Sequence, residues 1–350
     1  PPLTSLVLTP AAALAHHEFW QRATNTVLGI VFIPLVAYIV WRIAGRHAAV
    51  LAAVLAAFYP NLWMNDALIM SESLSALVAL IAIALAIRHR SRFDVRGAAL
   101  LGVAVGVAAL TRSELLLFAP LFALVGVRSH PWKLWAVRAG TIVVTTLVVL
   151  LPWTVYNSSR FHQFVPISTN AGGTLRGANC PDSYSGTGIG GWSVLCLLSD
   201  PALPGEDTSD LSVRYRREAV AYARAHESRL PVVAVARVAR SVDLYGLHDL
   251  VHAEVGEERA RWEAWAGIVS WWLLAPIAAI GWWKQRRTLG WVLAVPAITV
   301  VVTAVAFYGS DRLRISLEPV VVICAAMALA QFGVVRRQID AFVQGREALS

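Results

Sequence analysis

Residues 151–196 read LPWTVYNSSRFHQFVPISTNAGGTLRGANCPDSYSGTGIGGWSVLC, and within them a long apolar run breaks into polar, glycine-rich and cysteine-bearing sequence. The chain before this stretch consists mostly of apolar runs. After it the sequence stays amphiphilic up to Arg261, and then the apolar runs resume. Because such an insertion is far longer than a turn between two elements, we expect it to be functional or to form a small domain.

The composition excludes an ordinary soluble domain. Hydrophobic residues make up 57% of the chain, charged residues only 15%, and the mean hydropathy is +0.59, which lies outside the range of soluble globular proteins. We therefore predict an all-α polytopic membrane protein. The net charge of +8 does not indicate nucleic-acid binding, because the basic residues form short clusters between apolar runs, as in cytoplasmic loops.

A helix that spans a bilayer needs about 20 mostly apolar residues. On that basis the expected spans are residues 24–41, 47–63, 71–87, 97–110, 115–127, 137–155, 265–283, 289–308 and 315–335. The runs 97–110 and 115–127 are short, and they form either a bent hairpin or two complete spans. Both alternatives leave the rest of the chain on the same side of the membrane.

These runs divide the chain into three predicted parts. Residues 1–155 form an N-terminal transmembrane module with an interfacial helix within residues 1–23 and about six spans. Residues 156–261 form an extracytoplasmic loop region, in which residues 209–225 and 231–245 have the spacing of amphipathic helices. Residues 262–350 form a C-terminal transmembrane module with about three spans and a basic cytoplasmic tail.

The basic clusters give the orientation. If every run crosses, they share one side, which should be cytoplasmic. We predict a multi-pass protein of the plasma membrane with its active face outside the cytoplasm. The first residues lack the features of a signal peptide, and we expect the true beginning of the chain to lie upstream. The clusters are Arg42 and Arg46; Arg88, Arg90, Arg92 and Arg96; Arg128, Lys133 and Arg138; Lys284, Arg286 and Arg287; and Arg336 and Arg337.

The three cysteines are expected to behave differently. Cys324 lies inside an apolar run, where it packs as a small side chain. Cys180 and Cys196 flank a loop on the predicted outer side. That compartment permits a disulfide between them, although two unrelated thiols would give the same spacing.

Ionisable residues at the ends of spans are the main functional signal, because a charge at membrane depth is costly and tends to face a cavity. Carboxylates there can hold a metal or accept a proton, and arginine binds phosphate bidentately. The candidates on the predicted outer side are Asp66 and Glu72, Arg112 and Glu114, Arg160 and His162, and Asp311, Arg312, Arg314 and Glu318.

Each candidate also has a structural interpretation. Glu72 can satisfy free N–H groups at a helix N-terminus, Arg112 and Glu114 can form an ion pair at a hairpin tip, and Arg312 and Arg314 can anchor the chain at the interface. The histidines have no metal-ligand spacing and favour surface roles; they are His162, His248 and His252. The NAGG sequence at residues 170–173 can admit a ligand to the backbone or simply form a turn.

The chain resembles the GT-C membrane glycosyltransferases, in the branch that contains protein O-mannosyltransferases and the bacterial aminoarabinose transferase (glycosyltransferase family 39-like). The resemblance covers nearly the whole chain in order, although each matching piece alone is a weak motif. The pieces are PPLTSLVLTP at residues 1–10, MSESL at 70–74, ALTRSELLLFAPL at 109–121, PWTVYNSSRFHQFVPISTNAGG at 152–173 and YGSDRLRISLEP at 308–319.

The resemblance implies transfer of a hexosyl or pentosyl group from a polyprenyl-phosphate donor to a glycan, lipid or protein acceptor. The family's catalytic base would lie upstream of residue 1, and Glu72 matches its second acid, which could hold Mg²⁺ or Mn²⁺. Asp66, at the start of the same span, is a second catalytic candidate. Arg112, Arg312 and Arg314 match donor-phosphate contacts. Where relatives have an arginine, this chain has Tyr156, so that either Arg160 replaces that contact or the contact is missing. Further substrate contacts are expected from Glu114, Tyr156, Asn170 and Glu318.

Two other classes of function compete with the enzyme. A flippase or transporter of a lipid-linked intermediate would carry charges in the middle of its spans and show repeated halves, whereas these runs are nearly free of internal charge. A non-catalytic membrane subunit would use the outer region to bind a partner protein. An Asp-Glu pair in an upstream outer loop would favour the enzyme.

Overall fold

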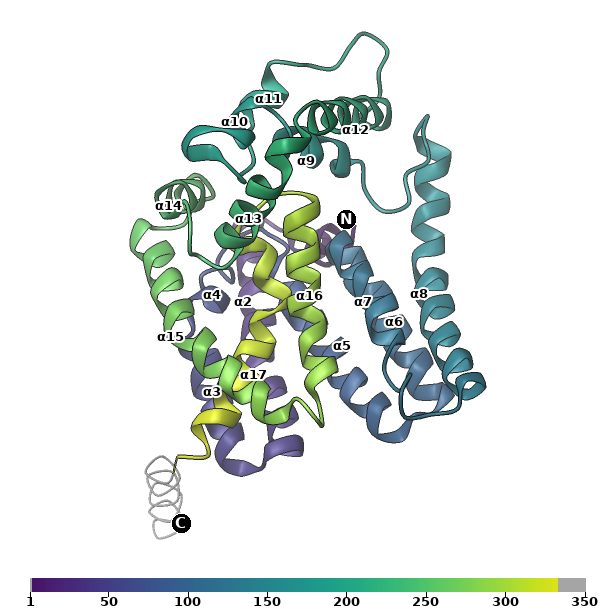
Figure 1. Cartoon of the computed structure of the whole chain (residues 1–350), viewed down its shortest axis with the longest axis vertical. Helices are drawn as coiled ribbons and strands as arrows, with labels where there is room; N and C mark the ends of the chain where they lie inside the picture. The colour runs from purple at the N-terminus through teal and green to yellow at the C-terminus, as the bar shows by residue number, and fades with distance from the viewer. Residues whose placement is uncertain (1, 333–350) are drawn as a thin grey trace.

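The computed structural model describes residues 2–332, and this part of the chain contains helices and loops without a β-strand. Long apolar helices form a bundle, and residues 161–260 cover one end of it, which we call the loop end (Figure 1). The predicted basic tail and the residues after 332 lie outside the described part. The helical bundle confirms the predicted all-α membrane fold.

The bundle begins with α1 (Leu3–Ala12), α2 (His17–Ala44), α3 (Arg46–Phe58), α4 (Pro60–Trp63), α5 (Glu72–Arg92), α6 (Val95–Thr111), α7 (Phe118–Ala123) and α8 (Trp132–Arg160). The loop end contributes α9 (Asn170–Ala178), α10 (Pro181–Tyr184), α11 (Leu195–Leu198), α12 (Thr208–Ala225), α13 (Leu230–Ser241) and α14 (Leu247–Gly256). The chain returns through α15 (Arg261–Gln285), α16 (Gly290–Ala306) and α17 (Glu318–Leu329). Short 3₁₀ turns occupy Ser113–Leu117, Gly186–Gly188, Glu227–Arg229 and Asp311–Ser316.

Four of the described helices, α2, α5, α8 and α15, are long and apolar enough to cross a bilayer. The other expected spans correspond to shorter apolar helices. The run 47–63, for example, breaks at Tyr59, which is extended because Pro60 follows it and disfavours a helical conformation there. The last expected span, 315–335, corresponds to α17, which begins only at Glu318 and ends at Leu329; residues 333–335 lie outside the described part.

Helix α5 forms the centre of the bundle. In the most apolar stretch of α5, 72% is buried inside the protein, compared with 22% for α2 and 17% for α8. A helix that is apolar on all sides is suited to such a position. Because α5 begins with Glu72 at the loop end, its N-terminus carries a charged residue into the middle of the protein.

The loops that carry the described basic clusters lie at the end of the bundle opposite the loop end (Figure 1). They connect α2 to α3, α5 to α6, α7 to α8 and α15 to α16. This arrangement agrees with the expected placement of these clusters on one side of the membrane. Arg336 and Arg337 lie outside the described residues.

The loop end is tied together by a disulfide and by a buried arginine. Cys180 and Cys196 are bonded to each other, as predicted. Arg237 of α13 is buried and donates to the carbonyl oxygens of Ala178 at 2.6 Å and Val305 at 2.8 Å, which lie at the C-terminal ends of α9 and α16. Such helix ends carry partial negative charge, so Arg237 fixes the loop end to the bundle. The expected helices 209–225 and 231–245 correspond to α12 and α13.

Helix α8 packs on α6 through glycine. A Cβ atom on Gly106 of α6 would lie 2.7 Å from the Cβ of Val149 and 3.0 Å from the carbonyl oxygen of Thr146. Gly102 one turn earlier is closer still, since a Cβ atom there would overlap Thr145 Oγ1 and the carbonyl oxygen of Ile142. Small residues at this spacing let membrane helices approach each other closely.

Gly106→Leu is therefore expected to force α6 and α8 apart and to destabilise the protein by about 1–3 kcal/mol, the usual cost of overpacking. The measurement is thermal unfolding of the purified protein in nanodiscs. Gly140→Leu on α8 is the matched control, because a Cβ there meets nothing within 4 Å. Equal unfolding temperatures for the two variants would contradict the close packing.

Candidate active site at the loop end

Glu72 lies at the centre of a buried ion-pair cluster. Its side chain is only 1% exposed, and its Oε1 accepts hydrogen bonds from Arg112 Nη1 at 3.0 Å and from Arg312 Nη2 at 2.6 Å. Burying a charge is costly unless it is paired, and two guanidinium groups together with the N-terminus of α5 provide that compensation. The structure thus brings together three of the candidates that the sequence predicted.

Each of these arginines also holds a second carboxylate. Arg112 lies in extended backbone between α6 and the Ser113–Leu117 turn, and its Nε donates to Glu114 Oε1 at 2.5 Å. Arg312, in the turn before α17, pairs with Glu257. The two guanidinium groups are therefore fixed in direction by four carboxylate contacts before any ligand arrives.

Arg259 extends the cluster and was missed in the sequence. Its Nη1 contacts Glu254 at 2.7 Å and Glu257 at 2.8 Å, and its Nη2 donates to Asn65 Oδ1 at 2.6 Å. The sequence GEER at residues 256–259 directly precedes α15. The other candidates were chosen because they are charged residues at the start of a span. The same criterion would also have identified Glu257 and Arg259.

Arg314 and Glu318 belong to a second ion-pair cluster that adjoins the Glu72 cluster across a small cavity of about 20 Å³. Arg314 is 1% exposed and donates to Asp243 Oδ2 at 2.8 Å and to Glu318 Oε1 at 2.7 Å, while its guanidinium lies 4.0 Å from the Trp271 ring centroid. Glu318 Oε2 accepts from the Tyr59 hydroxyl at 2.6 Å. Unlike Arg112 and Arg312, Arg314 and Glu318 do not line the large cavity described below, so we infer a structural role for them in place of the predicted donor and substrate contacts.

A cavity of about 890 Å³ opens beside the Glu72 cluster. Its polar end is formed by Ser113, Glu114, Asn170, Arg112 and Arg312. Away from that end its walls are mostly apolar and come from α7, α8 and α16; among these residues are Ala119, Pro120, Val143, Leu147, Val302 and Ala306. The cavity therefore combines a polar end that carries two arginines with mostly apolar walls.

Asp66 lies in a different place from Glu72. Its carboxylate accepts a hydrogen bond from Ser73 Oγ at 2.7 Å and lines a second cavity of about 300 Å³. Burial raises the pKa of Asp66 to about 6, opposed by the Ser73 hydrogen bond. The loop between α4 and α5 therefore directs the two predicted acids into different surroundings.

Arg160 and Tyr156 lie apart from the cluster. They are exposed residues of the last turns of α8, and Arg160 Nη1 donates to the Tyr156 hydroxyl at 2.6 Å. Neither residue lines the two larger cavities described above. The structure therefore does not bring Arg160 to the cavity that carries Arg112 and Arg312, where the sequence predicted that it would replace a donor contact of the family.

The surroundings of Glu72 do not suit the predicted Mg²⁺ or Mn²⁺. Divalent cations prefer several oxygen ligands, whereas two guanidinium groups already contact Glu72 Oε1. Their positive charge opposes a cation at that position. We therefore assign no step to a metal ion at Glu72.

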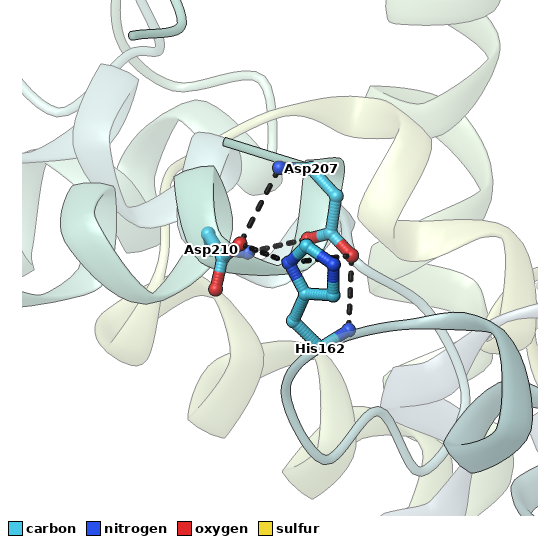
Figure 2. Close-up of side chains that lie close together, drawn as sticks. All are labelled: His162, Asp207 and Asp210. Carbon is cyan, nitrogen blue, oxygen red and sulfur yellow. Dashed lines mark hydrogen bonds and ion pairs between the residues drawn. The ribbon is translucent and has the colours of Figure 1, made fainter. Parts of the chain in front are cut away.

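His162, Asp207 and Asp210 do come together at the loop end (Figure 2). Asp207 caps α12 by accepting from the backbone N–H of Ser209 and Asp210, and it also accepts from the backbone N–H of His162 at 2.9 Å. The His162 ring lies 2.7 Å from Asp210 Oδ2 and is 66% exposed. Helix capping thus accounts for both carboxylates, and the group joins the loop after α8 to the start of α12.

This contact predicts a pH dependence. The hydrogen bond to Asp210 raises the pKa of His162 above its ordinary value of about 6.5. A raised pKa in the folded state means that the contact stabilises the protein fully below about pH 6.5 and that this contribution disappears as the pH rises through the folded-state pKa. His162→Gln should therefore lower the unfolding temperature more at pH 5.5 than at pH 8.5, whereas the exposed His252→Gln control should show no such difference. A pH-independent effect of His162→Gln would contradict the assignment.

Comparison with known proteins supports the fold. No protein-family model matches the chain, and no curated protein matches it. Its structure is similar to the crystal structure of the Archaeoglobus fulgidus oligosaccharyltransferase tethered to an acceptor peptide, with a TM-score of 0.52 and 13% sequence identity over 94% of this chain. The match spans 41% of that longer chain. The protein thus has a GT-C-type membrane fold.

Proposed function

We propose that this protein is a membrane glycosyltransferase that moves a sugar from a polyprenyl-phosphate donor to an acceptor at the loop end. The observation that carries the proposal is the cavity of about 890 Å³ with Arg112 and Arg312 at its polar end. A polyprenyl-phosphate sugar has the same division into a charged head and an apolar tail. The family 39-like resemblance of the sequence supports this class of donor, and the loop end is proposed to face outside the cytoplasm.

Arg112 and Arg312 are suited to a phosphate leaving group. Guanidinium groups bind phosphate oxygens bidentately, and preorganised positive charge stabilises the negative charge that develops as the leaving group departs. Glu72 holds both guanidinium groups through one oxygen atom. We therefore propose that Glu72 is a positioning residue, rather than the group that removes a proton from the acceptor.

The apolar walls are suited to the polyprenyl chain. Val143 and Leu147 of α8 face the cavity, and so do Val302 and Ala306 of α16. Burying apolar surface there stabilises the bound lipid by roughly 25 cal/mol per Å². A nucleotide-sugar donor would lack an apolar tail and would leave these walls unused.

The acceptor class is proposed more broadly. The similar archaeal structure carries an acceptor peptide, which is compatible with a glycan, lipid or protein acceptor for this chain. The loop end, built from α9 to α14, borders the cavity through residues of α9 and supplies the surface on which such an acceptor would lie. Asn170 at the polar end is the proposed contact to the sugar or acceptor.

The test uses the full-length protein in proteoliposomes with a panel of radiolabelled polyprenyl-phosphate sugars and a membrane extract as the acceptor source. We expect label to leave the lipid for at least one donor, and Glu72→Ala to prevent this while the protein remains folded. If the labelled lipid instead crosses the bilayer intact and no donor is cleaved, the protein is a flippase and the transferase proposal fails.

A further inference from the structure

Carboxylates already occupy the edges of Arg112 and Arg312 to which a phosphate would bind. A guanidinium group binds a phosphate bidentately through one of two edges, formed by Nε with Nη2 or by Nη1 with Nη2. Arg112 donates from Nε to Glu114 Oε1 at 2.5 Å and from Nη1 to Glu72 Oε1 at 3.0 Å. Arg312 donates from Nε and Nη2 to Glu72 Oε1 at 2.9 Å and 2.6 Å, and its Nη1 pairs with Glu257. A phosphate therefore competes with at least one of these three carboxylates for a bidentate contact.

Two of the three carboxylates are held too firmly to give way. Glu72 is 1% exposed and bonds both arginines, so its displacement would leave a buried charge without compensation. Glu257 pairs with Arg259 at 2.8 Å as well as with Arg312, and it does not line the large cavity. Neither carboxylate is therefore positioned to exchange with a ligand.

Glu114 is bound more loosely. Within the described part of the chain Arg112 is its one ion-pair partner, and its second carboxylate oxygen accepts no hydrogen bond there. The side chain is 17% exposed and lines the large cavity beside Arg112. It extends from the Ser113–Leu117 turn between α6 and α7, so it can rotate away without disturbing either helix. Its departure opens the Arg112 edge formed by Nε and Nη2, where Nη2 donates to no described residue.

The charge of the reaction product makes such an exchange useful. A polyprenyl-phosphate sugar is a phosphodiester with one negative charge, whereas the polyprenyl phosphate left after transfer is a monoester with a charge of about −1.5 to −2 at pH 7. Two arginines therefore attract the product more strongly than the donor. Product release limits the turnover of many enzymes, and a carboxylate attached to the site competes with the product at a high effective concentration.

We propose that Glu114 is the residue that expels the product: its carboxylate bonds Arg112 in the empty site, moves aside when the donor phosphate binds, and returns to displace polyprenyl phosphate after transfer. The proposal rests on the proposed glycosyltransferase function. Only ion pairs exchange in this step, since no covalent bond forms to Glu114. Glu72 keeps both arginines in place throughout the cycle.

Binding of the product tests the competition directly. Radiolabelled polyprenyl phosphate is titrated against the full-length protein in nanodiscs. Glu114→Gln should bind it about tenfold more tightly than the wild type, because the amide keeps the shape of the side chain without its charge. Glu258→Gln, the same change at an exposed carboxylate, should bind like the wild type. Unchanged or weaker binding by folded Glu114→Gln would overturn the proposal, and so would equal tightening in Glu257→Gln.

Turnover provides a measurement that a merely structural role would not affect. We expect Glu114→Ala to transfer about one sugar per protein rapidly and then to continue about tenfold more slowly than the wild type, because the product stays bound. Added formate supplies a free carboxylate and should restore much of the later rate, whereas chloride at the same concentration should not. A Glu114→Ala protein without the initial burst, or one that formate does not accelerate, would contradict a role in release.

These results separate the proposal from the function on which it rests. If the wild type binds polyprenyl phosphate but Glu114→Gln binds it no more tightly, only the role of Glu114 fails. If the wild type does not bind polyprenyl phosphate and cleaves no labelled donor, the donor site itself is wrong.

Discussion

Arg112→Ala is expected to lower the rate of sugar transfer by about 100-fold to 1,000-fold, the usual effect of removing one preorganised group that stabilises developing negative charge. Arg112 lines the large cavity and holds both Glu72 and Glu114. Arg112→Lys should recover only part of the rate, because an ammonium group keeps the charge but loses the planar, bidentate geometry. Single-turnover rates with a saturating labelled donor measure the effect.

The contrast with Arg160→Ala makes this prediction specific. Arg160 lies near the same end of the bundle, but its guanidinium bonds the Tyr156 hydroxyl and does not line the cavity. We expect its replacement to leave the transfer rate within about twofold, as for surface positions away from a site. An equal loss in both variants would show that overall positive charge, rather than the Arg112 position, determines the rate.

Stability must be measured alongside activity for Arg112→Ala. The substitution leaves the buried Glu72 with Arg312 as its remaining close guanidinium partner, and an under-compensated buried charge destabilises a protein. Glu72→Gln in the Arg112→Ala background removes that charge. If the double variant regains stability, the stability lost in Arg112→Ala belongs to the under-compensated Glu72 carboxylate, and the transfer rates of Arg112→Ala and wild type are then compared per amount of folded protein.

The sequence could predict the convergence of Glu72, Arg112 and Arg312 because each of them stands at the end of an apolar run on the same predicted side. Counting the expected spans between these residues was sufficient to place all three on one side of the membrane. The different surroundings of the two acids, Asp66 and Glu72, could not be predicted in this way. Asp66 and Glu72 are six positions apart in sequence, and only the path of the loop before α5 places Asp66 against Ser73 and Glu72 against Arg112 and Arg312.

The lengths of the spans show a similar limit. Apolar composition located the helices, but Tyr59 ends α3 early and Glu318 begins α17 late. In both cases a proline follows, and it fixes where a helix can begin. The disulfide was within reach of the sequence because the predicted compartment of the loop and its two cysteines pointed to the same result.

The role of Arg314 was accessible only in part. Arg314 and Glu318 are four residues apart, a spacing at which oppositely charged side chains pair, and the structure forms that pair. The third member, Asp243, lies at the end of α13, far away in sequence. No local pattern predicts that contact, and without it Arg314 resembles a free cation beside Arg312.

Arg314→Met is consequently expected to act on stability, with a loss of about 3–5 kcal/mol, the range for removing one partner from a buried ion pair. The change leaves Asp243 and Glu318 as two buried carboxylates without their shared cation, and it removes the stacking on Trp271. Unfolding of the nanodisc-bound protein by heat or denaturant measures the loss. Arg22→Met is the matched control, because its pair with Glu258 is exposed and such pairs contribute at most about 1 kcal/mol.

A compensating variant distinguishes this structural role from donor binding. Neutralising both acids in the Arg314→Met background, with Asp243→Asn and Glu318→Gln, removes the unpaired charges, and replacing a whole buried ion cluster by neutral groups is often tolerated. We expect this triple variant to regain most of the lost stability and to bind polyprenyl phosphate like the wild type. A stable triple variant that no longer binds the lipid would return Arg314 to the phosphate site, because only a direct contact would be lost along with the arginine.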